Sequence, residues 1–400
     1  KLKNTPHQKI AVNLYLLFFP TRAVTHRLRE RLLGKRSFKN YLYLLFNCTL
    51  GKTLGKLRFF RTLIRKIDYF TFSVPNEIQK YFDEFKPSSI IVSDVFYEID
   101  SLFQIAAKKN RTKQISIVRS WDNTTNKGLL RQIPDYLIVN NDNIGKEAIN
   151  LHDASEKTIF VGGFPQFDMA FRRLPQNRID FFKSINLDPK KKLLIFCPAG
   201  QQISDTDWQI CEILKIGQQQ GKITKNLQFL VRSHPLDPAR LEKFSPNDSF
   251  SIECPGIKFK DRDKVTELKK ADQEHLMDSL FHCDILLNIT STISLDCLPF
   301  NKPQILISFD GWEKLNFIKS IRHFQTDEHF ATLVQSGAIT VANNPDELYK
   351  AIELYIENPM FNVENRSKAL SYQIGNTDGN AGSRFGAEVA RLIKQNVHHR

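Results

Sequence analysis

The sequence lacks any hydrophobic run long enough to cross a bilayer. Two apolar segments near its start, residues 10–20 and 41–46, reach at most about half of the ~20 residues that a spanning helix needs. No small-residue cleavage site follows the first segment, so it does not have the form of a signal peptide. We therefore expect a cytoplasmic protein without a spanning helix.

Cysteine is scarce, and its spacing excludes the common metal sites. The six cysteines form no Cys-x-x-Cys pair and are accompanied by no His-rich segment. We therefore expect no structural zinc and a reducing compartment. Three of them, Cys197, Cys283 and Cys297, lie in or beside apolar runs, where cysteine behaves as a small hydrophobic residue.

Glycine-rich phosphate loops are also missing. The sequence has neither a Walker A motif nor a Gly-x-Gly-x-x-Gly motif, which argues against a P-loop NTPase and a classical dehydrogenase. No zinc-finger, RNP-like or helix-turn-helix signature accompanies its basic residues, so we expect no nucleic-acid partner.

Acidic residues are nearly absent from the first 70 positions. Residues 1–70 contain 16 Lys and Arg but only two acids, Glu30 and Asp68, so they carry the whole net charge of +14. Apolar and basic blocks alternate in this segment. The pattern predicts interfacial helices on an anionic membrane surface, where each nearby basic residue adds about 1 kcal/mol. The alternative is a set of ordinary core helices with a solvated basic face.

After about residue 75, short apolar runs alternate with helical stretches. The first four runs, at residues 89–93, 114–119, 135–140 and 158–161, are typical of strands buried on both faces. The segment 162–175 has paired Gly and two Pro, and we interpret it as a hinge. The alternation of apolar runs and helical stretches then resumes, with runs at residues 192–197, 228–232, 251–253, 284–288 and 304–308. The sequence thus predicts an α/β protein with two Rossmann-like parallel sheets that face a cleft.

Two polar motifs follow strands of the second predicted sheet. Arg232 and His234 come directly after one strand, where a guanidinium can grip phosphate and an imidazole can donate to it. Ser291, Thr292 and Ser294 belong to a hydroxyl-rich turn after another strand, which also includes Thr290 and could hold phosphate at a helix start. The alternatives are a loop His beside a turn Pro and a simple helix N-cap.

Two carboxylates follow strands of the first predicted sheet. Asp94 ends the first strand, and Asp122 lies in the loop WDNTTNKG after the second strand. Either could act as the general base that removes a proton from an acceptor hydroxyl. Trp121, Asn123 and Lys127 of the same loop are candidates for contact with the acceptor. The alternative for Asp122 is a turn that only shapes the loop.

Four motifs together resemble one family. GGFPQFD (162–168), RSHP (232–235), DILLNITSTISLD (284–296) and KPQILISFD (302–310) follow one another in the order found in bacterial CDP-glycerol glycerophosphotransferase-like proteins. That superfamily shares its C-terminal half with capsule Kdo transferases and related surface-polysaccharide glycosyltransferases. The resemblance covers about residues 85–312, and the loop WDNTTNKG is similar to one in surface-carbohydrate members.

The resemblance implies a GT-B fold with the donor nucleotide in the C-terminal domain. It assigns His234, Ser291, Thr292 and Ser294 to the donor diphosphate, and it puts Asp310 near the place where such enzymes close around the donor. It implies no metal and no cofactor, in keeping with the lack of an Asp-x-Asp triplet at a strand end. The family's catalytic His in a Gly-rich N-terminal loop has no counterpart here, which favours sugar transfer with a carboxylate base.

The predicted function is therefore transfer of a sugar from a nucleotide-activated donor to a lipid-linked or glycan acceptor during cell-surface polysaccharide synthesis. The enzyme would work at the inner face of the membrane. Three alternatives stay open: a CDP-glycerol-type glycerophosphotransferase, an enzyme similar to UDP-GlcNAc 2-epimerase, and a non-catalytic membrane-associated assembly protein.

The same sequence patterns predict the domains. Residues 1–70 form the basic membrane-proximal segment of the N-terminal domain, 71–165 its Rossmann-like acceptor part, 166–345 the donor-nucleotide domain and 346–400 the closing helices.

Overall fold

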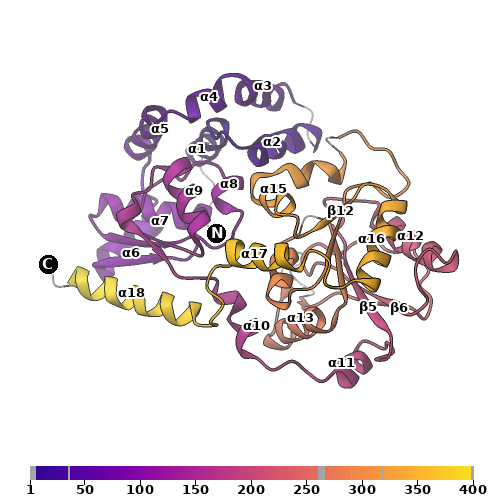
Figure 1. The fold of residues 1–400 in the computed structure, drawn as a ribbon. Helices are drawn as coiled ribbons and strands as arrows, with labels where there is room; N and C mark the ends of the chain where they lie inside the picture. The colour runs from indigo at the N-terminus through magenta and orange to yellow at the C-terminus, as the bar shows by residue number, and fades with distance from the viewer. Residues whose placement is uncertain (1–5, 35–36, 260–265, 290, 318, 398–400) are drawn as a thin grey trace. The chain divides into compact units, whose positions relative to one another are not determined.

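The structure is a computed structural model, and it describes residues 6–34, 37–259, 266–289, 291–317 and 319–397. The chain divides into two compact units (Figure 1). The first contains Lys1–Pro165, Asp327–His329 and Ile374–Arg400, and the second contains Gln166–Thr326 and Phe330–Gln373. Within the described residues we find no helix with the length and apolar character of a membrane span.

A four-stranded parallel sheet organises the first unit. Its strands lie side by side in chain order, so each is linked to the next by a crossover on the sheet surface. They are β1 (Ser89–Val92), β2 (Lys113–Ile117), β3 (Tyr136–Val139) and β4 (Ile159–Val161), and the helices around them are α6 (Asn76–Phe85), α7 (Glu98–Lys109), α8 (Asn123–Asn126) and α9 (Asp142–His152).

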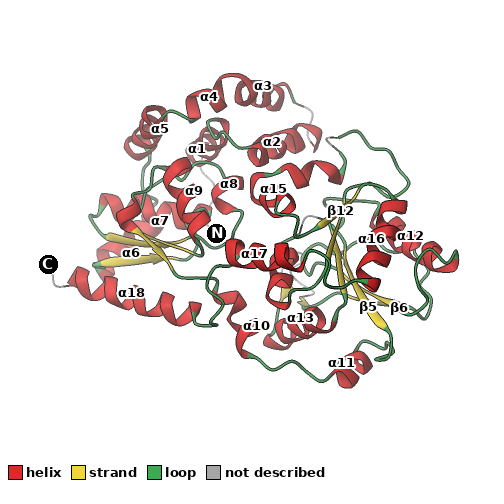
Figure 2. Ribbon diagram, in the orientation of Figure 1, coloured by secondary structure: helices red, strands yellow, loops and turns green. Residues whose placement is uncertain are grey.

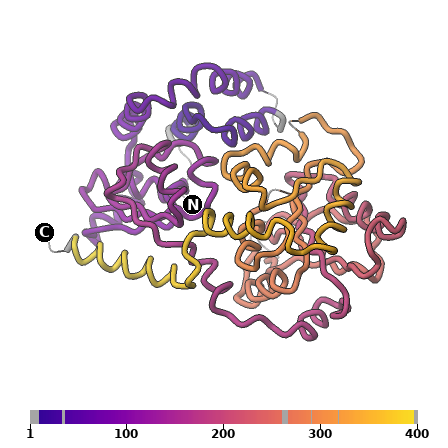
Figure 3. The backbone as a smooth tube through the Cα atoms, in the orientation of Figure 1, coloured from indigo at the N-terminus to yellow at the C-terminus, as the bar shows by residue number. Residues whose placement is uncertain are grey.

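The two faces of this sheet are covered by distant parts of the chain. On β2, Ile115 packs with Leu392 of α18 (Ala381–Val397), whereas the hydroxyl of Ser116 accepts a hydrogen bond of 2.9 Å from Gln104 of α7. Because successive side chains of a strand point to opposite faces, α7 and α18 cover opposite sides of the sheet. The last helix of the chain therefore runs beside strands of the first unit, as Figure 3 shows.

The basic N-terminal segment forms a layer of helices around a small apolar core that includes Tyr15, Phe19, Leu28 and Ile64. Its elements are α1 (Pro6–Leu17), α2 (Arg22–Gly34), α3 (Phe38–Phe46), a π-helical turn over Asn47–Gly51, α4 (Lys52–Gly55) and α5 (Arg58–Thr71).

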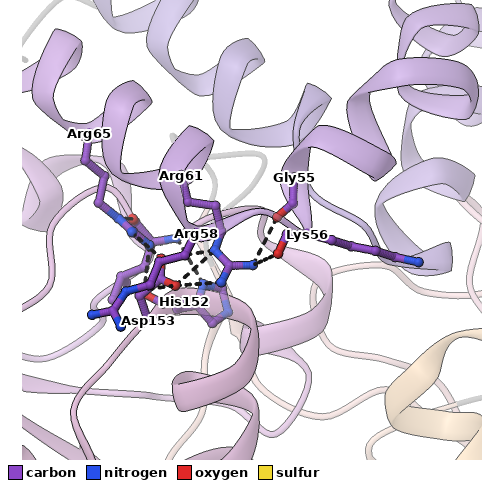
Figure 4. Close-up of polar contacts among 8 residues, drawn as sticks. Gly55, Lys56, Arg58, Arg61, Arg65, His152 and Asp153 are labelled. Carbon is purple, nitrogen blue, oxygen red and sulfur yellow. Dashed lines mark hydrogen bonds and ion pairs between the residues drawn. The ribbon is translucent and has the colours of Figure 1, made fainter.

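Helix α5 buries three of its charged side chains, Arg61, Arg65 and Asp68, and exposes four of its large apolar ones. Arg61 and Arg65 are both buried, and both bind the carboxylate of Asp153, at 2.6 Å and 2.7 Å (Figure 4). Burial alone would raise the pKa of Asp153, but the hydrogen bonds from the two arginines lower it. Arg65 also donates to the backbone carbonyls of Leu130 and His152. The outward apolar residues of α5 are Phe59, Leu63, Ile67 and Phe70.

A six-stranded parallel sheet organises the second unit. The strand order is β12-β11-β10-β5-β6-β7, so the chain extends from β5 to one side and then returns to build the other side from β10. The strands are β5 (Lys192–Cys197), β6 (Leu227–Arg232), β7 (Phe250–Glu253), β10 (Ile285–Asn288), β11 (Gln304–Ile307) and β12 (Thr340–Ala342), and a separate antiparallel pair consists of β8 (Ile257–Lys258) and β9 (Thr266–Glu267).

Helices cover both faces of this second sheet (Figure 2). Leu194 and Phe196 of β5 pack in one core, and the alternate residues Leu193 and Ile195 pack in another on the opposite face. The first core is closed by α12 (Asp207–Gln219) and α16 (Pro345–Glu357), the second by α11 (Arg178–Ser184) and α13 (Lys270–His282). The other helices are α10 (Asp168–Arg172), α14 (Ile293–Cys297), α15 (Glu328–Gln335) and α17 (Val363–Gln373).

The predicted α/β fold with two parallel sheets is confirmed. The run at residues 192–197 coincides with β5, and the other predicted runs match strands to within one or two residues. The sequence does not predict the edge strand β12, because three residues are too few to show a periodic pattern.

The glycine pair in the segment that we interpret as a hinge has a packing role. A Cβ atom on Gly162 would lie 2.3 Å from the ring of Phe385, and one on Gly163, whose φ is +95°, would lie 2.9 Å from the Cβ of Ala381. Both partners belong to α18, so the absence of side chains lets this helix approach the chain after β4. The division between the two units follows at Pro165.

We expect Asp153→Asn to lower the free energy of unfolding by about 3–5 kcal/mol, because it leaves two buried guanidinium groups without a counter-charge. Asparagine tolerates the positive φ of this position, so the backbone should be kept. Urea denaturation measures the change. The control is Arg58→Ala, whose side chain is 81% exposed and 4.0 Å from Asp153; it should cost less than about 1 kcal/mol. Equal effects of the two variants would contradict this account.

Candidate functional site

The carboxyl ends of β5, β6 and β10 border a cavity of about 260 Å³ in the second unit. We call it the switch-point cavity, because the strand order reverses between β5 and β10. In open parallel sheets, ligands bind at such a point. The residues that line it include Cys197, Arg232, His234, Ser291, Thr292 and Asp296.

Arg232 is the last residue of β6. It lines the cavity and forms an ion pair with a carboxylate of the protein. Its guanidinium binds the carboxylate of Glu253 on the neighbouring strand β7, and the other oxygen of that carboxylate binds Nε2 of His275 at 2.8 Å. Burial would raise the pKa of Glu253, but the hydrogen bond from His275 and the charge of Arg232 lower it. Arg232 is therefore held in place by a carboxylate and has further donors for a ligand.

His234 follows on the same loop. Its Nδ1 accepts a hydrogen bond of 3.2 Å from the backbone N–H of Leu236, so the neutral imidazole carries its proton on Nε2. Burial lowers the pKa of His234, while the charge of Asp237 acts in the opposite direction. Near neutral pH this side chain is thus an uncharged N–H donor.

Asp296 brings an ionisable carboxyl group into the same cavity. Its burial raises its pKa to about 7, and the positive charge of Arg232 offsets only part of this effect. The sequence does not single out Asp296, because an acid in the first turn of a helix is common. The structure shows that it shares a cavity with four of the predicted phosphate ligands.

The hydroxyl-rich turn after β10 is divided between the cavity and the protein interior. Ser291 and Thr292 line the cavity. Ser294 is buried, and its hydroxyl donates to Oδ1 of Asn288 at 3.3 Å. Thr290 lies outside the described residues.

Asp310 also lies apart from the cavity lining. It is buried after β11, and its carboxylate accepts a hydrogen bond of 2.9 Å from the backbone N–H of Ile321. The structure thus brings together Arg232, His234, Ser291 and Thr292 of the six predicted donor residues, while Ser294 and Asp310 are buried and make hydrogen bonds to other parts of the second unit.

In the first unit, the predicted loop WDNTTNKG contains helix α8. The carboxylate of Asp122 accepts hydrogen bonds from the hydroxyl of Ser120 at 2.6 Å and from the amide of Asn126 at 3.3 Å. Ser120 directly precedes the loop, and Asn126 belongs to it. The carboxylate therefore shapes the loop, as the alternative interpretation of Asp122 expects.

A histidine from a remote part of the chain packs against this loop. The ring of His329 meets the buried ring of Trp121 edge to face at 5.0 Å, and its Nδ1 lies 3.3 Å from the hydroxyl of Thr125. Burial lowers the pKa of His329, and the charges of nearby acids, of which Asp122 has the largest effect, act in the opposite direction. About 200 residues separate the partners, so no local pattern could reveal this contact.

The residues just before His329 bind the start of helix α2. Asp327 lies 2.6 Å from Nδ1 of His26, and Glu328 accepts hydrogen bonds from the backbone N–H groups of Arg22 and Ala23. A carboxylate at a helix start satisfies free N–H groups and matches the helix dipole. This short segment therefore stabilises the basic N-terminal layer.

Asp94 lines a second cavity, of about 250 Å³, which we call the first-unit cavity. Its carboxylate accepts hydrogen bonds from the N–H of Phe96 at 3.1 Å and from the amide of Asn123 at 3.4 Å, and Arg119 lies 3.8 Å away. Lys127 lines the same cavity. The structure thus groups Asp94, Asn123 and Lys127, whereas Trp121 is packed against His329.

Residues 101–391 match the family of CDP-glycerol:poly(glycerophosphate) glycerophosphotransferases. The chain belongs to this family. The match runs from α7 to α18, so it includes parts of both units. The resemblance read from four sequence motifs is confirmed, and with it the assignment of the chain to a family of nucleotide-activated transferases. No curated protein sequence matches this glycerophosphotransferase family member.

Solved structures with a TM-score above 0.5 support the fold. The S. aureus MnaA–UDP co-structure has 13% identity and a TM-score of 0.52, with 84% of this chain and 82% of that chain covered. UDP-GlcNAc 2-epimerase from Neisseria meningitidis bound to UDP-GlcNAc has 11% identity and a TM-score of 0.51, with coverage of 83% and 82%. The wall teichoic acid polymerase TagF has 15% identity and a TM-score of 0.46, with coverage of 82% and 87%. The GT-B fold class is confirmed.

The charges of the switch-point cavity predict pH-dependent binding of a diphosphate diester. As pH rises through about 7, Asp296 becomes charged and repels the ligand, so affinity should fall several-fold between pH 6.5 and 8.5. CDP-glycerol is a suitable probe in calorimetry, since its diphosphate diester does not titrate in this range. The variant Asp296→Asn should bind with nearly constant affinity. The same decline in wild type and variant would contradict the prediction.

Proposed function

We propose that this protein is a transferase of cell-surface polymer synthesis that binds the diphosphate of a nucleotide-activated donor in the switch-point cavity. The observation that carries the proposal is the convergence of Arg232, His234, Ser291 and Thr292 at the point where the strand order reverses. Arg232 contributes positive charge, His234 an Nε2–H donor and the two hydroxyls further donors. No Gly-rich loop is needed for such a site.

For the donor, we favour CDP-glycerol. Family membership supports a glycerophosphate donor. The sequence favours a sugar donor because WDNTTNKG contains no histidine, but His329 contacts Trp121 and Thr125 of this loop in the folded chain. The absence of a histidine within the loop therefore no longer counts against glycerophosphate transfer. A nucleotide sugar stays as the second candidate, supported by the free access of the Asp94 carboxylate to a cavity.

In the proposed reaction, the oxygen of an acceptor hydroxyl attacks the phosphorus that carries glycerol. The new P–O bond forms as the bond to the CMP oxygen breaks, and CMP leaves with the electron pair. Asp94 takes the proton of the hydroxyl. We prefer Asp94 to Asp122 as the base, because Asp94 lines a cavity and both oxygens of Asp122 bind the loop. Arg232 and the Nε2–H of His234 stabilise the charge that develops on the departing phosphate.

The nucleotide that is released distinguishes the candidate functions. With membranes as the source of acceptor, we expect CMP from CDP-glycerol, whereas transfer from a nucleoside diphosphate sugar would release a nucleoside diphosphate. Asp94→Asn should lower kcat by about 10²–10⁴-fold, as loss of a general base does, and should leave CDP-glycerol binding intact. His234→Ala should weaken that binding. Asp83→Asn, at an exposed carboxylate of α6, is the matched control.

Each alternative has its own outcome in this assay. Conversion of UDP-GlcNAc to its epimer without an acceptor would support the epimerase alternative. If the folded protein releases no nucleotide from either CDP-glycerol or a nucleotide sugar, the result would support the non-catalytic assembly protein.

We further propose that helices α3 and α5 rest on the inner face of the membrane. Phe38 of α3 is 76% exposed, and Phe59 and Phe70 of α5 are 70% and 78% exposed. The exposed apolar residues recur at helical spacing, and such surfaces mark interaction sites. Exposed cations accompany them, which suits an anionic bilayer. These cations are Lys39, Lys56, Arg58 and Lys66.

Vesicle sedimentation tests the membrane proposal. The wild-type chain should bind vesicles with phosphatidylglycerol, and binding should weaken in high salt because charges are screened. Phe59→Ser combined with Phe70→Ser should lower binding by at least about tenfold, because each buried aromatic ring contributes about 1.5–3 kcal/mol. Leu174→Ser alters a residue of the second unit that is 88% exposed and is the control. If the double Phe variant and Leu174→Ser bind the vesicles equally well, the basic N-terminal segment is a solvated surface and not a membrane-binding one.

A further inference from the structure

Two arginines of this protein bind a buried carboxylate through two nitrogens each. Arg131 donates from Nε and Nη2 to the two oxygens of Asp68, at 3.0 Å and 2.9 Å. Arg173 donates from Nη1 and Nη2 to the two oxygens of Asp278, at 2.6 Å and 2.9 Å. Because the guanidinium fork matches the shape of a carboxylate, such two-point pairs are the expected geometry. Each pair occupies two nitrogens of its arginine.

The pair between Arg232 and Glu253 has only one such bond. The two residues are partners in register on the parallel strands β6 and β7, so their side chains are neighbours. Nevertheless, only Nη1 of Arg232 binds Glu253, and it binds Oε1 alone. Within the described part of the chain, Nε and Nη2 of Arg232 form no hydrogen bond. These two nitrogens are therefore available to a ligand of the switch-point cavity, which Arg232 lines.

The second oxygen of Glu253 is occupied by a histidine of α13. Nε2 of His275 lies 2.8 Å from Oε2, and it must be the donor because an ionised carboxylate only accepts. The ring of His275 also packs against the buried ring of Phe181, with 5.8 Å between the ring centroids. With Oε2 engaged in this way, Glu253 has one oxygen left for Arg232.

We infer that His275 is a positioning residue for the donor phosphate. By binding Oε2 of Glu253, it prevents a two-point ion pair with Arg232 and leaves Nε and Nη2 of this arginine for phosphate oxygens. Without His275, Glu253 would take two nitrogens of Arg232, as Asp68 and Asp278 do with their arginines. A phosphate would then have to displace a charged hydrogen bond before it could bind.

His275 acts through Glu253, because it lies outside the lining of the switch-point cavity. The inference rests on the proposed function, in which Arg232 binds the donor diphosphate. The alternative is a structural role, in which His275 only fastens α13 to the edge strand β7. The two roles predict different effects when the charge of Glu253 is removed.

Calorimetric titration of the full chain with CDP-glycerol tests the inference. His275→Asn should weaken binding by about tenfold or more, as expected when a charged hydrogen bond is lost. The amide N–H of asparagine corresponds in position to Nδ1 of the ring and leaves Oε2 of Glu253 unoccupied. In His275→Gln the amide N–H corresponds to Nε2, so this variant should recover most of the affinity. Equal binding by the wild type and His275→Asn would overturn the inference.

His282→Asn is the matched control. His282 lies on the same helix, and its ring stacks on the same Phe181 at 5.0 Å, but its Nε2 lies 2.7 Å from the backbone carbonyl of Gln176 and not from a carboxylate. This variant should lower the free energy of unfolding in urea and leave CDP-glycerol binding unchanged. If it weakens binding as much as His275→Asn does, the packing of α13 governs affinity and the inference is overturned.

Glu253→Gln separates positioning from fastening. The amide oxygen still accepts from Nη1 of Arg232, but the negative charge is gone, so CDP-glycerol should bind at least as tightly as it binds the wild type. Addition of His275→Asn to this variant should then cause no further loss, because the two side chains act as one unit. If Glu253→Gln weakens binding as His275→Asn does, His275 only fastens the helix and the inference is overturned.

The same titrations distinguish this inference from the proposed function. If the wild type binds no CDP-glycerol, the donor site fails and the positioning role fails with it. If the wild type and every variant of His275 bind CDP-glycerol equally well, the donor site stands and the positioning role alone is overturned.

Discussion

The ion pairs of Asp153 with Arg61 and Arg65 are the interaction on which the first unit depends. A buried guanidinium needs a counter-charge, so the face of α5 that contains both arginines must turn toward Asp153. The opposite face, which contains Phe59 and Phe70, is then left at the surface. Helix α5 thus buries two arginines while it exposes two aromatic rings, and the reason is electrostatic.

The same helix supports the polar loop that follows β2. Arg65 binds the carbonyl of Leu130 at 2.9 Å, and Asp68 binds Arg131. Residues of this loop line the first-unit cavity together with Asp94 and with Arg27 and Arg31 of α2. One set of buried charges thus positions both the proposed membrane face and the proposed acceptor site.

The proposed phosphate site of the second unit contains no glycine-rich loop. Strand order brings Arg232, His234 and the hydroxyl-rich turn to one place. The positive charge of Arg232 is balanced by Glu253, and a carboxyl with a pKa of about 7 lies in the same cavity. The proposed binding of an anion there would depend on directed donors rather than on excess positive charge, which agrees with the neutral composition of the chain after residue 70.

Sequence patterns determined the strands and the residues that follow them, since a short apolar run and its flanking polar residues are local properties. Arg232, His234, Ser291 and Thr292 could therefore be predicted. Ser294 was predicted with them, but it lies two residues after Thr292, and its hydroxyl donates to Asn288 instead of lining the cavity. The tertiary structure alone decided the contact of His329 with Trp121 and the burial of Arg61 and Arg65 on α5. Each of these features depends on residues that are far apart in the chain. Local sequence patterns cannot reveal them, because burial and charge pairing act between residues that are neighbours in space.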